Sequence, residues 1–484
     1  MIFFSFEFFI FIFISLCIFH LFRKTRWCPY IIAIINFVFI SSFAHSLYQL
    51  IPLFSFLLLG YLSIAIIYKY PSTKAFGTLI VLILGLFIYF KRYTIINFLP
   101  ALPQKFEIIG LSYILFRIIQ LLIDIKDGII NQPITPIDYF NFICFFLNFV
   151  SGPIQSFQSF HIQNKALTQA TLTDDIVYHA FARIILGFIK VIILTQLVPI
   201  YIFDAHEFLL ARPSTFNIIH AQLIGLMCWY AVATLSYLFL LYMNFSGYMD
   251  IIIGIGKLFY FDLPENFNRP FAANNFLEFW SRWHITLSTW FKNYIFYPFL
   301  KYMLKQWNKP KFSLYFGIIA YFITFFIIGL WHATTIQFII CGTLFGLGTS
   351  INKAYQAIMV KIYGKNKYHQ YQKNLLYHYL SRGLTIAYFA LALTCFWLKT
   401  NQFNAFFNGR FFLTIFIDII LLTFLLASAF FIWDLLMEKT TDIKLVLIRS
   451  SCLQYIALGI GIFLLTGAMV NAIYTAPTFI YKTF

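Results

Sequence analysis

Hydrophobic residues in this chain occur in long runs that short polar stretches separate. A helix that crosses a membrane needs roughly 20 mainly apolar residues, because the hydrocarbon layer is about 30 Å thick. The apolar runs lie near 2–22, 29–44, 51–68, 76–90, 108–124, 137–150, 176–203, 220–243, 312–330, 333–352, 381–398, 411–433 and 452–474. After short and re-entrant pieces are discounted, this pattern predicts about 11 to 13 transmembrane or re-entrant helices.

The composition also favours a bilayer as the solvent of this protein. Hydrophobic residues make up 61% of the 484 residues and charged residues only 11%, whereas about a quarter of a soluble domain is charged. Backbone polar groups inside a bilayer must be satisfied within the protein, which favours helices. We therefore predict an all-α, polytopic integral membrane protein. No linker or soluble tail interrupts the pattern, so we expect one membrane domain over residues 1–484.

The formal net charge of +17 bears on which partner the protein binds and not on its fold class. In a membrane protein such a charge typically reports basic loops beside anionic lipid head groups. We therefore expect the lipid bilayer as a partner and no nucleic acid. The seven cysteines are scattered and form no CxxC motif, so we expect neither a disulfide framework nor a metal site.

One passage, ENFNRPFAANNFLEFWSRWHITLSTW at 265–290, is unusually polar and aromatic for this chain. Its apolar residues recur at steps of three and four, which predicts one amphipathic aromatic helix from Phe276. In such a helix Glu278 and Arg282 form an i,i+4 pair, and His284 and Ser288 share a face. A helix of this kind is also typical of a simple interfacial anchor.

A second histidine lies in even more apolar surroundings. No Asp, Glu, Lys or Arg occurs between Lys311 and Lys353, and His332 lies at the midpoint of that stretch. Two spans must fit there, so we expect His332 where they meet, with Gly329 allowing a close backbone approach. An ionisable residue inside a membrane is a functional candidate, and a buried neutral imidazole can accept a proton from an alcohol. The alternative is a histidine that only bonds a neighbouring carbonyl.

These two histidines and the residues around them resemble the membrane-bound O-acyltransferase family. The resemblance is to its bacterial branch, which includes alginate O-acetylation proteins and proteins of D-alanine transfer to teichoic acids. Its motifs are LYMNFSGYMDIIIGIGKLF (241–259), PENFNRPF (264–271), EFWSRWHITLSTWFKNYIFYPF (278–299) and GLWHATTIQFIICGTLFG (329–346), so the motif core covers 241–346. Three positions depart from the family pattern: Asn244, Asn293 and Ala333 stand where Asp, Asp and Gly are usual.

The resemblance implies an O-acyltransferase with His332 as the catalytic histidine and His284 as the second characteristic one. Tyr242, Asn244, Ser246, Tyr248 and Trp331 are the further candidates to line the substrate site. The implied reaction moves an acyl group, acetyl being expected, from a cytoplasmic thioester to a hydroxyl of a cell-envelope polysaccharide. Acetyl-CoA or an acyl-carrier-protein thioester would be the donor, with no bound cofactor or metal.

The family resemblance also implies a place and partners. We expect a multi-pass protein of the inner (cytoplasmic) membrane and an exported partner protein that completes the transfer. One alternative is D-alanyl transfer toward teichoic acid, for which the basic sequence at 300–312 would suit an acidic carrier protein. A transporter or flippase of an activated lipid or glycan is the alternative from another class. It needs polar residues along several spans, whereas here they concentrate in 242–293 and at His332.

Overall fold

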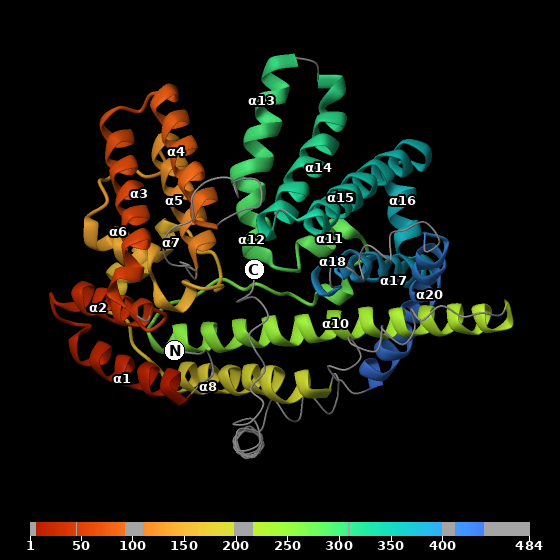
Figure 1. The fold of residues 1–484 in the computed structure, drawn as a ribbon, viewed down its shortest axis with the longest axis horizontal. Helices are drawn as coiled ribbons and strands as arrows, with labels where there is room; N and C mark the ends of the chain where they lie inside the picture. Colours follow the sequence, from red (N-terminus) through yellow and green to blue (C-terminus); the bar gives the residue numbers. More distant parts are fainter. Residues whose placement is uncertain are drawn as a thin grey trace. The chain divides into compact units, whose positions relative to one another are not determined.

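The computed structural model of this protein describes residues 6–44, 46–91, 110–197, 216–307, 310–333, 335–398 and 412–439. Within these ranges the fold is built from helices, and β pairing is confined to one isolated bridge between Phe267 and Trp283 (Figure 1). Seven of the described helical segments are long and apolar enough to cross a membrane. The predicted all-α membrane fold is confirmed, while the expected span at 452–474 lies outside the described residues.

The described chain divides into two compact units. The first contains residues 1–187 together with 248–265, and the second contains 188–247 together with 266–439. Whether they act as the one domain predicted from the sequence stays a prediction. The first unit contains α1 (Phe6–Phe22), α2 (Cys28–Ser41), η1 (Leu47–Leu50), α3 (Ile51–Lys69), α4 (Thr73–Lys91), α5 (Leu111–Lys126), α6 (Pro136–Ile143), η3 (Phe146–Asn148), α7 (Phe157–Ala166) and α8 (Asp174–Phe188).

The second unit begins with η4 (Ile189–Ile193) and η5 (Leu194–Leu197), and α10 (Phe216–Leu258) contributes residues to both units. The rest of the second unit consists of η7 (Pro270–Ala272), α11 (Phe276–Trp280), α12 (Ile285–Phe291), η8 (Lys292–Phe296), α13 (Tyr297–Trp307), η9 (Pro310–Phe312), α14 (Ser313–His332), α15 (Ile336–Tyr363), α16 (Lys365–Gln372), α17 (Leu375–Ala392), α18 (Thr394–Trp397) and α20 (Phe412–Lys439).

The expected span at 137–150 is wrong as a continuous helix, because a buried arginine ends α6 early. Arg117 on α5 is fully buried, and its guanidinium donates hydrogen bonds to the carbonyl oxygens of Phe142 (3.1 Å), Ile143 (2.7 Å) and Asn148 (2.6 Å). A helix that continued through this stretch would need those oxygens for its own backbone N–H groups. The arginine therefore stabilises a turn where the hydrophobic pattern alone predicts a helix.

A second arginine ties two distant segments of the first unit together. Arg183 on α8 donates from Nε to the Asp250 carboxylate at 3.0 Å and from Nη1 to the Glu265 carboxylate at 2.6 Å. The Arg183 and Asp250 side chains are largely shielded from solvent, whereas Glu265 is exposed. The contact between Arg183 and Asp250 is therefore stronger than an exposed ion pair. Asp250, one of the isolated acidic residues of the apolar runs, thus has a structural partner.

Helices α14 and α15 form a closely packed hairpin in the second unit. A Cβ atom on Gly329 of α14 would lie only 2.2 Å from the Cα atom of Gly342 on α15. Gly342 and Gly346 stand four residues apart and both face α14, the small-xxx-small pattern that lets membrane helices approach closely. His332 is the last residue of α14. The expectations that two helices meet at His332 and that Gly329 allows a close approach are confirmed.

This close packing predicts different outcomes for two glycines of the same helix. Gly329→Ala forces backbone against backbone and should destabilise the protein by about 1–3 kcal/mol. Gly317→Ala is the matched control, because a Cβ atom there would meet nothing within 4 Å. Thermal unfolding of the detergent-solubilised variants measures the difference. Equal midpoints for both variants would show that the hairpin does not depend on the Gly329–Gly342 approach.

Candidate active site

The helix predicted from Phe276 is interrupted at the first candidate histidine. Helix α11 ends at Trp280, and α12 begins only at Ile285. Between them His284 adopts a left-handed backbone conformation with φ of 44°, which a residue inside an α-helix does not have. The prediction that His284 and Ser288 share one helix face is therefore wrong. His284 instead caps the start of α12.

The cause of this interruption is pairing with the motif PENFNRPF. The N–H of Asn268 donates to the carbonyl oxygen of Arg282 at 2.9 Å, and the N–H of Ile285 donates to that of Asn266 at 2.9 Å. Phe267 and Trp283 form the antiparallel bridge between these two bonds. Because the loop takes these backbone groups, they are not available for a continuous helix. Hydrophobic periodicity carries no information about such a long-range pairing.

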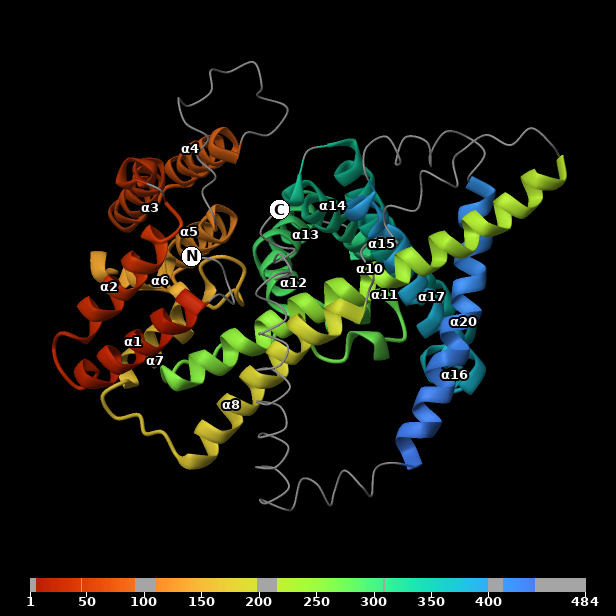
Figure 2. The same cartoon turned by 60° about the horizontal axis from the view of Figure 1, so that its bottom comes forward.

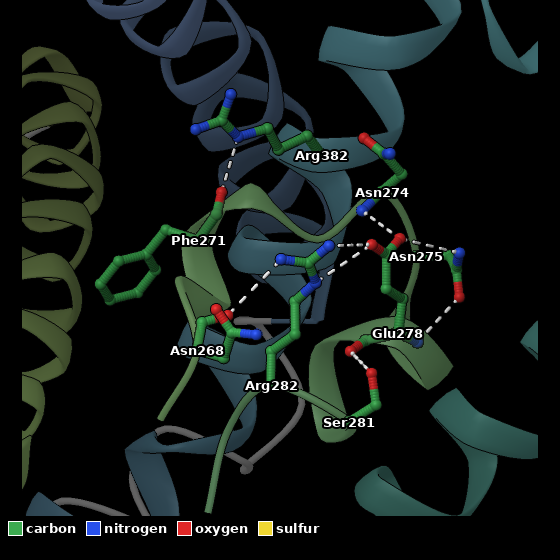
Figure 3. A network of polar contacts seen from close by, with 8 residues as sticks. All are labelled: Asn268, Phe271, Asn274, Asn275, Glu278, Ser281, Arg282 and Arg382. Carbon is green, nitrogen blue, oxygen red and sulfur yellow. Dashed lines mark hydrogen bonds and ion pairs between the residues drawn. The ribbon is translucent and has the colours of Figure 1, made fainter. Parts of the chain in front are cut away.

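The predicted Glu278–Arg282 pair is confirmed and supports the same loop (Figure 3). Arg282 Nη2 lies 2.8 Å from Glu278 Oε1, while its Nη1 donates to the carbonyl oxygen of Asn268 at 3.5 Å. The other carboxylate oxygen of Glu278 accepts from the N–H of Asn274 at 3.0 Å. Asn275 caps α11 by accepting a hydrogen bond from the N–H of Glu278. Together these contacts hold α11 against the loop before it.

A third arginine, Arg382, contacts the last residue of the PENFNRPF loop. Arg382 on α17 donates from Nε to the carbonyl oxygen of Phe271 at 2.6 Å (Figure 3). Its Nη1 lies 2.7 Å from the carboxylate of Asp434 on α20. Asp434, an acidic residue of a candidate membrane span, therefore has its ion-pair partner on a neighbouring helix. The buried Arg382 side chain thus joins the loop, α17 and α20, although Asp434 is partly exposed to solvent.

His284 is held by an asparagine that the sequence interpretation did not select. The side-chain oxygen of Asn266 lies 3.2 Å from His284 Nδ1, 3.1 Å from the N–H of Thr286 and 2.9 Å from the Thr286 hydroxyl. The backbone N–H can only donate, so the Asn266 atom must be the carbonyl oxygen. His284 Nδ1 therefore carries the proton and donates it to Asn266. In the neutral ring this leaves the basic lone pair on Nε2.

The surroundings of His284 keep the ring neutral. Its side chain is 2% exposed, and the Phe245 ring packs edge-on at 4.8 Å between centroids. Burial, and to a smaller extent repulsion between two positive rings because His332 is nearby, lowers the pKa of His284 to about 3. The two candidate histidines therefore lie within electrostatic reach of each other. At neutral pH His284 is an uncharged hydrogen-bonding group.

His332 is enclosed by aromatic rings at the end of α14. Its ring centroid lies 4.6 Å from that of Trp331 and 4.9 Å from that of Phe396, and it stacks on Phe338 at 6.0 Å. The residue is 8% exposed. Trp331, a predicted lining residue, thus directly contacts the predicted catalytic histidine. The His332 ring therefore lies in a low-polarity environment made of aromatic side chains.

The other predicted lining residues lie on α10 and differ in their surroundings. The Tyr242 ring contacts Phe267, Phe271 and Trp283, so it packs on the loop that holds His284. Asn244 and Ser246 are buried on the same part of α10 in the second unit. Tyr248 is fully buried in the first unit, beside Arg117 and the backbone of Ser151. Tyr242 and Trp331 are therefore the predicted lining residues that contact the histidine region directly.

Asn266 is the functional candidate that the sequence interpretation missed. It lies inside PENFNRPF and is fully buried although its side chain is polar. Nothing in the local sequence distinguishes Asn266 from Asn268, which is exposed two residues later. The PENFNRPF motif marks this stretch of the sequence as part of the candidate site. Only the fold identifies the asparagine that contacts His284.

Comparison with known proteins defines the class of this protein. The family model of MBOAT, the membrane-bound O-acyltransferase family, matches residues 61–373, which is more than half of the chain. The chain therefore belongs to this family and is an O-acyltransferase. The predicted family and enzyme class are confirmed, and the matched region contains both histidines with their supporting loop.

Three individual relatives show which members of the family the chain is similar to. The chain is 30% identical to a teichoic acid D-alanyltransferase of Bacillus subtilis over 313 residues, which are 62% of this chain and 74% of the relative. It is 33% identical to the probable alginate O-acetylase AlgI of Azotobacter vinelandii over 51% of this chain and 44% of that protein. It is 36% identical to a peptidoglycan O-acetyltransferase of Helicobacter pylori over 45% of this chain and 38% of the relative. The alignments thus cover less than half the length of the latter two proteins.

The neutral state of His284 predicts a pH dependence of stability. Its folded-state pKa of about 3 lies below the ordinary value of about 6.5 that applies in the unfolded chain. As the pH falls below 6.5, His284 becomes protonated in the unfolded chain but stays neutral in the folded protein. Stability is therefore lost, by about 2 kcal/mol at pH 5. His284→Gln should remove this loss.

Thermal unfolding of the solubilised protein at pH 7.5 and at pH 5 measures the effect. The midpoint of the His284→Gln variant should fall less than that of the wild type between the two values. His179→Gln, which changes an exposed histidine on α8, should behave as the wild type. If the midpoint of the His284→Gln variant fell as much as that of the wild type, His284 would not be a buried neutral group.

Proposed function

We propose that this protein transfers an acyl group, acetyl in the first instance, from a cytoplasmic thioester to a hydroxyl of a cell-envelope polysaccharide. The observation that carries the proposal is the pair His284 and His332, both buried in one unit and within electrostatic reach of each other. The relatives named for alginate, peptidoglycan and teichoic acid support an envelope polymer as the acceptor. An enzyme of this kind would belong in the inner (cytoplasmic) membrane.

In the proposed reaction the neutral imidazole of His332 acts as the general base. It takes the proton of the acceptor hydroxyl as that oxygen attacks the thioester carbonyl carbon. The resulting tetrahedral intermediate expels the thiolate, which receives the proton from the His332 imidazolium, so that an ester and a thiol are released. General-base action of this type contributes about 10²–10⁴-fold to the rate. The aromatic surroundings of His332 would exclude water, which would otherwise compete with the hydroxyl.

We assign His284 the task of orienting the donor or assisting the proton transfer. Its Nδ1–H is committed to Asn266, so Nε2 presents a lone pair in a fixed direction. In this proposal Tyr242 and Trp331 form part of the substrate lining, and Asn244, Ser246 and Tyr248 are further candidates on α10. Asn266 is a positioning residue, because it acts through His284 and not on the substrate itself.

The proposed donor is acetyl-CoA or the thioester of an acyl carrier protein. Helix α13 supports the carrier alternative, since it has no buried residue and carries Lys301 and Lys305 beside the exposed rings of Tyr302 and Trp307. A cationic and aromatic face of this kind suits an acidic protein surface. We propose no bound cofactor or metal. An exported partner that delivers the acyl group to the final polymer remains part of the proposal.

D-alanyl transfer toward teichoic acid is the second candidate. The observation in its favour is the coverage of the Bacillus subtilis D-alanyltransferase, which extends over 74% of that protein. In this second candidate, D-alanyl transfer differs from acetyl transfer in the acyl group and the carrier, and it would use the same two histidines. A transporter or flippase of an activated lipid or glycan has less support, because a polar path would have to continue along several spans.

Replacement of His332 tests the proposal. Ester-linked acyl groups of the cell-surface glycans are measured by NMR before and after mild base. The compared cells carry the wild type, His332→Ala or no protein. The ester signal should fall to the deletion level in His332→Ala, and the lost resonance identifies acetyl or D-alanyl. His179→Ala, which removes an exposed histidine, is the control that should retain the signal, and immunodetection checks membrane insertion of each variant. A wild-type signal in His332→Ala would favour a scaffold or transporter.

The positioning role of Asn266 generates a separate prediction. Asn266→Ala removes the acceptor for His284 Nδ1 and for both Thr286 donors, so the ester content or initial rate should fall by about 10- to 100-fold. Asn266→Asp keeps an acceptor oxygen and should recover part of the activity with a pH profile shifted upward, because a carboxylate favours the imidazolium. Asn268→Ala removes an exposed asparagine of the same loop and should have wild-type activity. If Asn266→Ala and Asn268→Ala had equal activity, Asn266 would not have a positioning role.

A further inference from the structure

A cavity of about 1120 Å³ lies in the second unit, among α11, α15, α16, α17 and α20. Helices α15, α16, α17 and α20 are neighbours in both views of the fold (Figure 2). At one end the hydroxyls of Tyr355 on α15 and Tyr377 on α17 lie 3.4 Å apart. At the other end the Tyr388 ring closes on Phe276 at 5.1 Å. Neither candidate histidine of the active site lines this cavity.

One end of the cavity is lined by groups that suit a phosphate. Lys373, His369 and His378 supply nitrogen donors, and Tyr355, Tyr368 and Tyr377 supply hydroxyl donors. Lys373 is exposed and stands two residues before Leu375, where a candidate membrane span begins. A cation at that position lies at the level of lipid head groups.

The other end of the cavity is lined by apolar groups. Ile351 of α15, Leu384 of α17 and Phe424 of α20 face it, and all three are more than one third exposed. Leu384 and Phe424 belong to two candidate membrane spans. From Tyr377 to Leu384 helix α17 advances about 10 Å at 1.5 Å per residue. The cavity therefore joins a polar end at the interface to an apolar end about that distance further along the spans.

The charged residues around the cavity indicate the charge of the ligand it would bind. From Phe279 to Ile417 the sequence contains no Asp or Glu, although it contains lysines and arginines on both sides of the uncharged stretch 312–352. Glu278 lines the cavity, but its carboxylate is paired with Arg282 at 2.8 Å. Asp434 of α20 contacts the hydroxyl of the lining residue Tyr379, and its carboxylate is paired with Arg382 at 2.7 Å. The exposed Lys373 is therefore not balanced by an acidic residue of the surrounding helices α15, α16 and α17. This basic excess favours an anion at the polar end.

We propose that this cavity is a binding site for one anionic phospholipid. The phosphate contacts Lys373 and the tyrosine and histidine donors, and an acyl chain lies along Leu384, Ile351 and Phe424. The volume exceeds that of a single ordered ion and is slightly larger than the upper end, about 1,000 Å³, of drug-sized ligand pockets. The bound lipid would join α16 and α17 to α15 and α20. This inference is independent of the acyl-transfer proposal, because the cavity contains neither candidate histidine.

The test uses the full chain purified in detergent and titrated with phosphatidylglycerol, with bound lipid counted by native mass spectrometry. We expect one phosphatidylglycerol to be retained more tightly than any other. Lys373→Gln should weaken that binding about fivefold, the contribution typical of one lysine at an anionic lipid. Lys367→Gln is the matched control, because Lys367 is exposed on α16 and does not line the cavity.

A second pair of variants tests the site of the acyl chain. Leu384→Trp fills the apolar end and should abolish the tight binding. Leu376→Trp adds the same bulk to an exposed position of α17 that does not line the cavity, and it should retain the lipid. Identical binding by both tryptophan variants, or by both glutamine variants, would overturn the proposal.

Two other probes distinguish the chemistry of the ligand. Phosphatidylcholine has the same chains without the net negative charge, so it should bind more weakly than phosphatidylglycerol, and equal binding would overturn the anionic assignment. Inorganic phosphate carries the head-group charge without the chains. Failure of excess phosphate to displace phosphatidylglycerol would support a lipid site. Displacement would identify a site for a soluble phosphate and overturn the lipid assignment.

Discussion

The side-chain oxygen of Asn266 accepts from a histidine ring, a backbone N–H and a hydroxyl, all in a region shielded from water. A buried donor without an acceptor costs about 1–3 kcal/mol, so this single oxygen decides the conformation of the residues around it. It fixes the tautomer of His284, and the adjacent backbone pairing holds His284 in a left-handed conformation. Arg282 and Arg382 support the same loop by donating to its carbonyl oxygens. The region is organised by polar contacts inside an otherwise apolar protein.

His332 is placed by a different physical principle. It lies at the end of α14, and the α14–α15 hairpin depends on glycines that allow backbone contact. Membrane helices gain little from hydrophobic burial against one another, because lipid is as apolar as their side chains. Close van der Waals packing supplies the association instead. One histidine is thus positioned by hydrogen bonds to a loop and the other by helix packing. Both are buried in the second unit, within electrostatic reach of each other.

This combination is suited to acyl transfer at a membrane. The family match defines the class of enzyme, while the neutral form of His284 and the aromatic surroundings of His332 are properties of this chain. A neutral base among aromatic rings can take a proton from a hydroxyl without a permanent charge that the apolar surroundings would have to solvate. The lipid cavity is built from other residues, with its cation at the start of a candidate span. Catalysis and lipid binding are therefore assigned to separate parts of the second unit.

The sequence by itself determined the all-α membrane class, the family motifs, the two histidines and the meeting of two helices at His332. These features follow from runs of apolar residues and from local motifs, and both are visible without contacts. The tertiary structure decided that α6 ends at Ile143, that the helix from Phe276 is interrupted at His284, and that Asn266 rather than Asn268 contacts the ring. In each case a distant polar group takes backbone or side-chain hydrogen bonds that the local pattern assigns to a helix. Periodicity reports which face of a segment is apolar, whereas the partner of a buried polar group is set by residues far away in the chain.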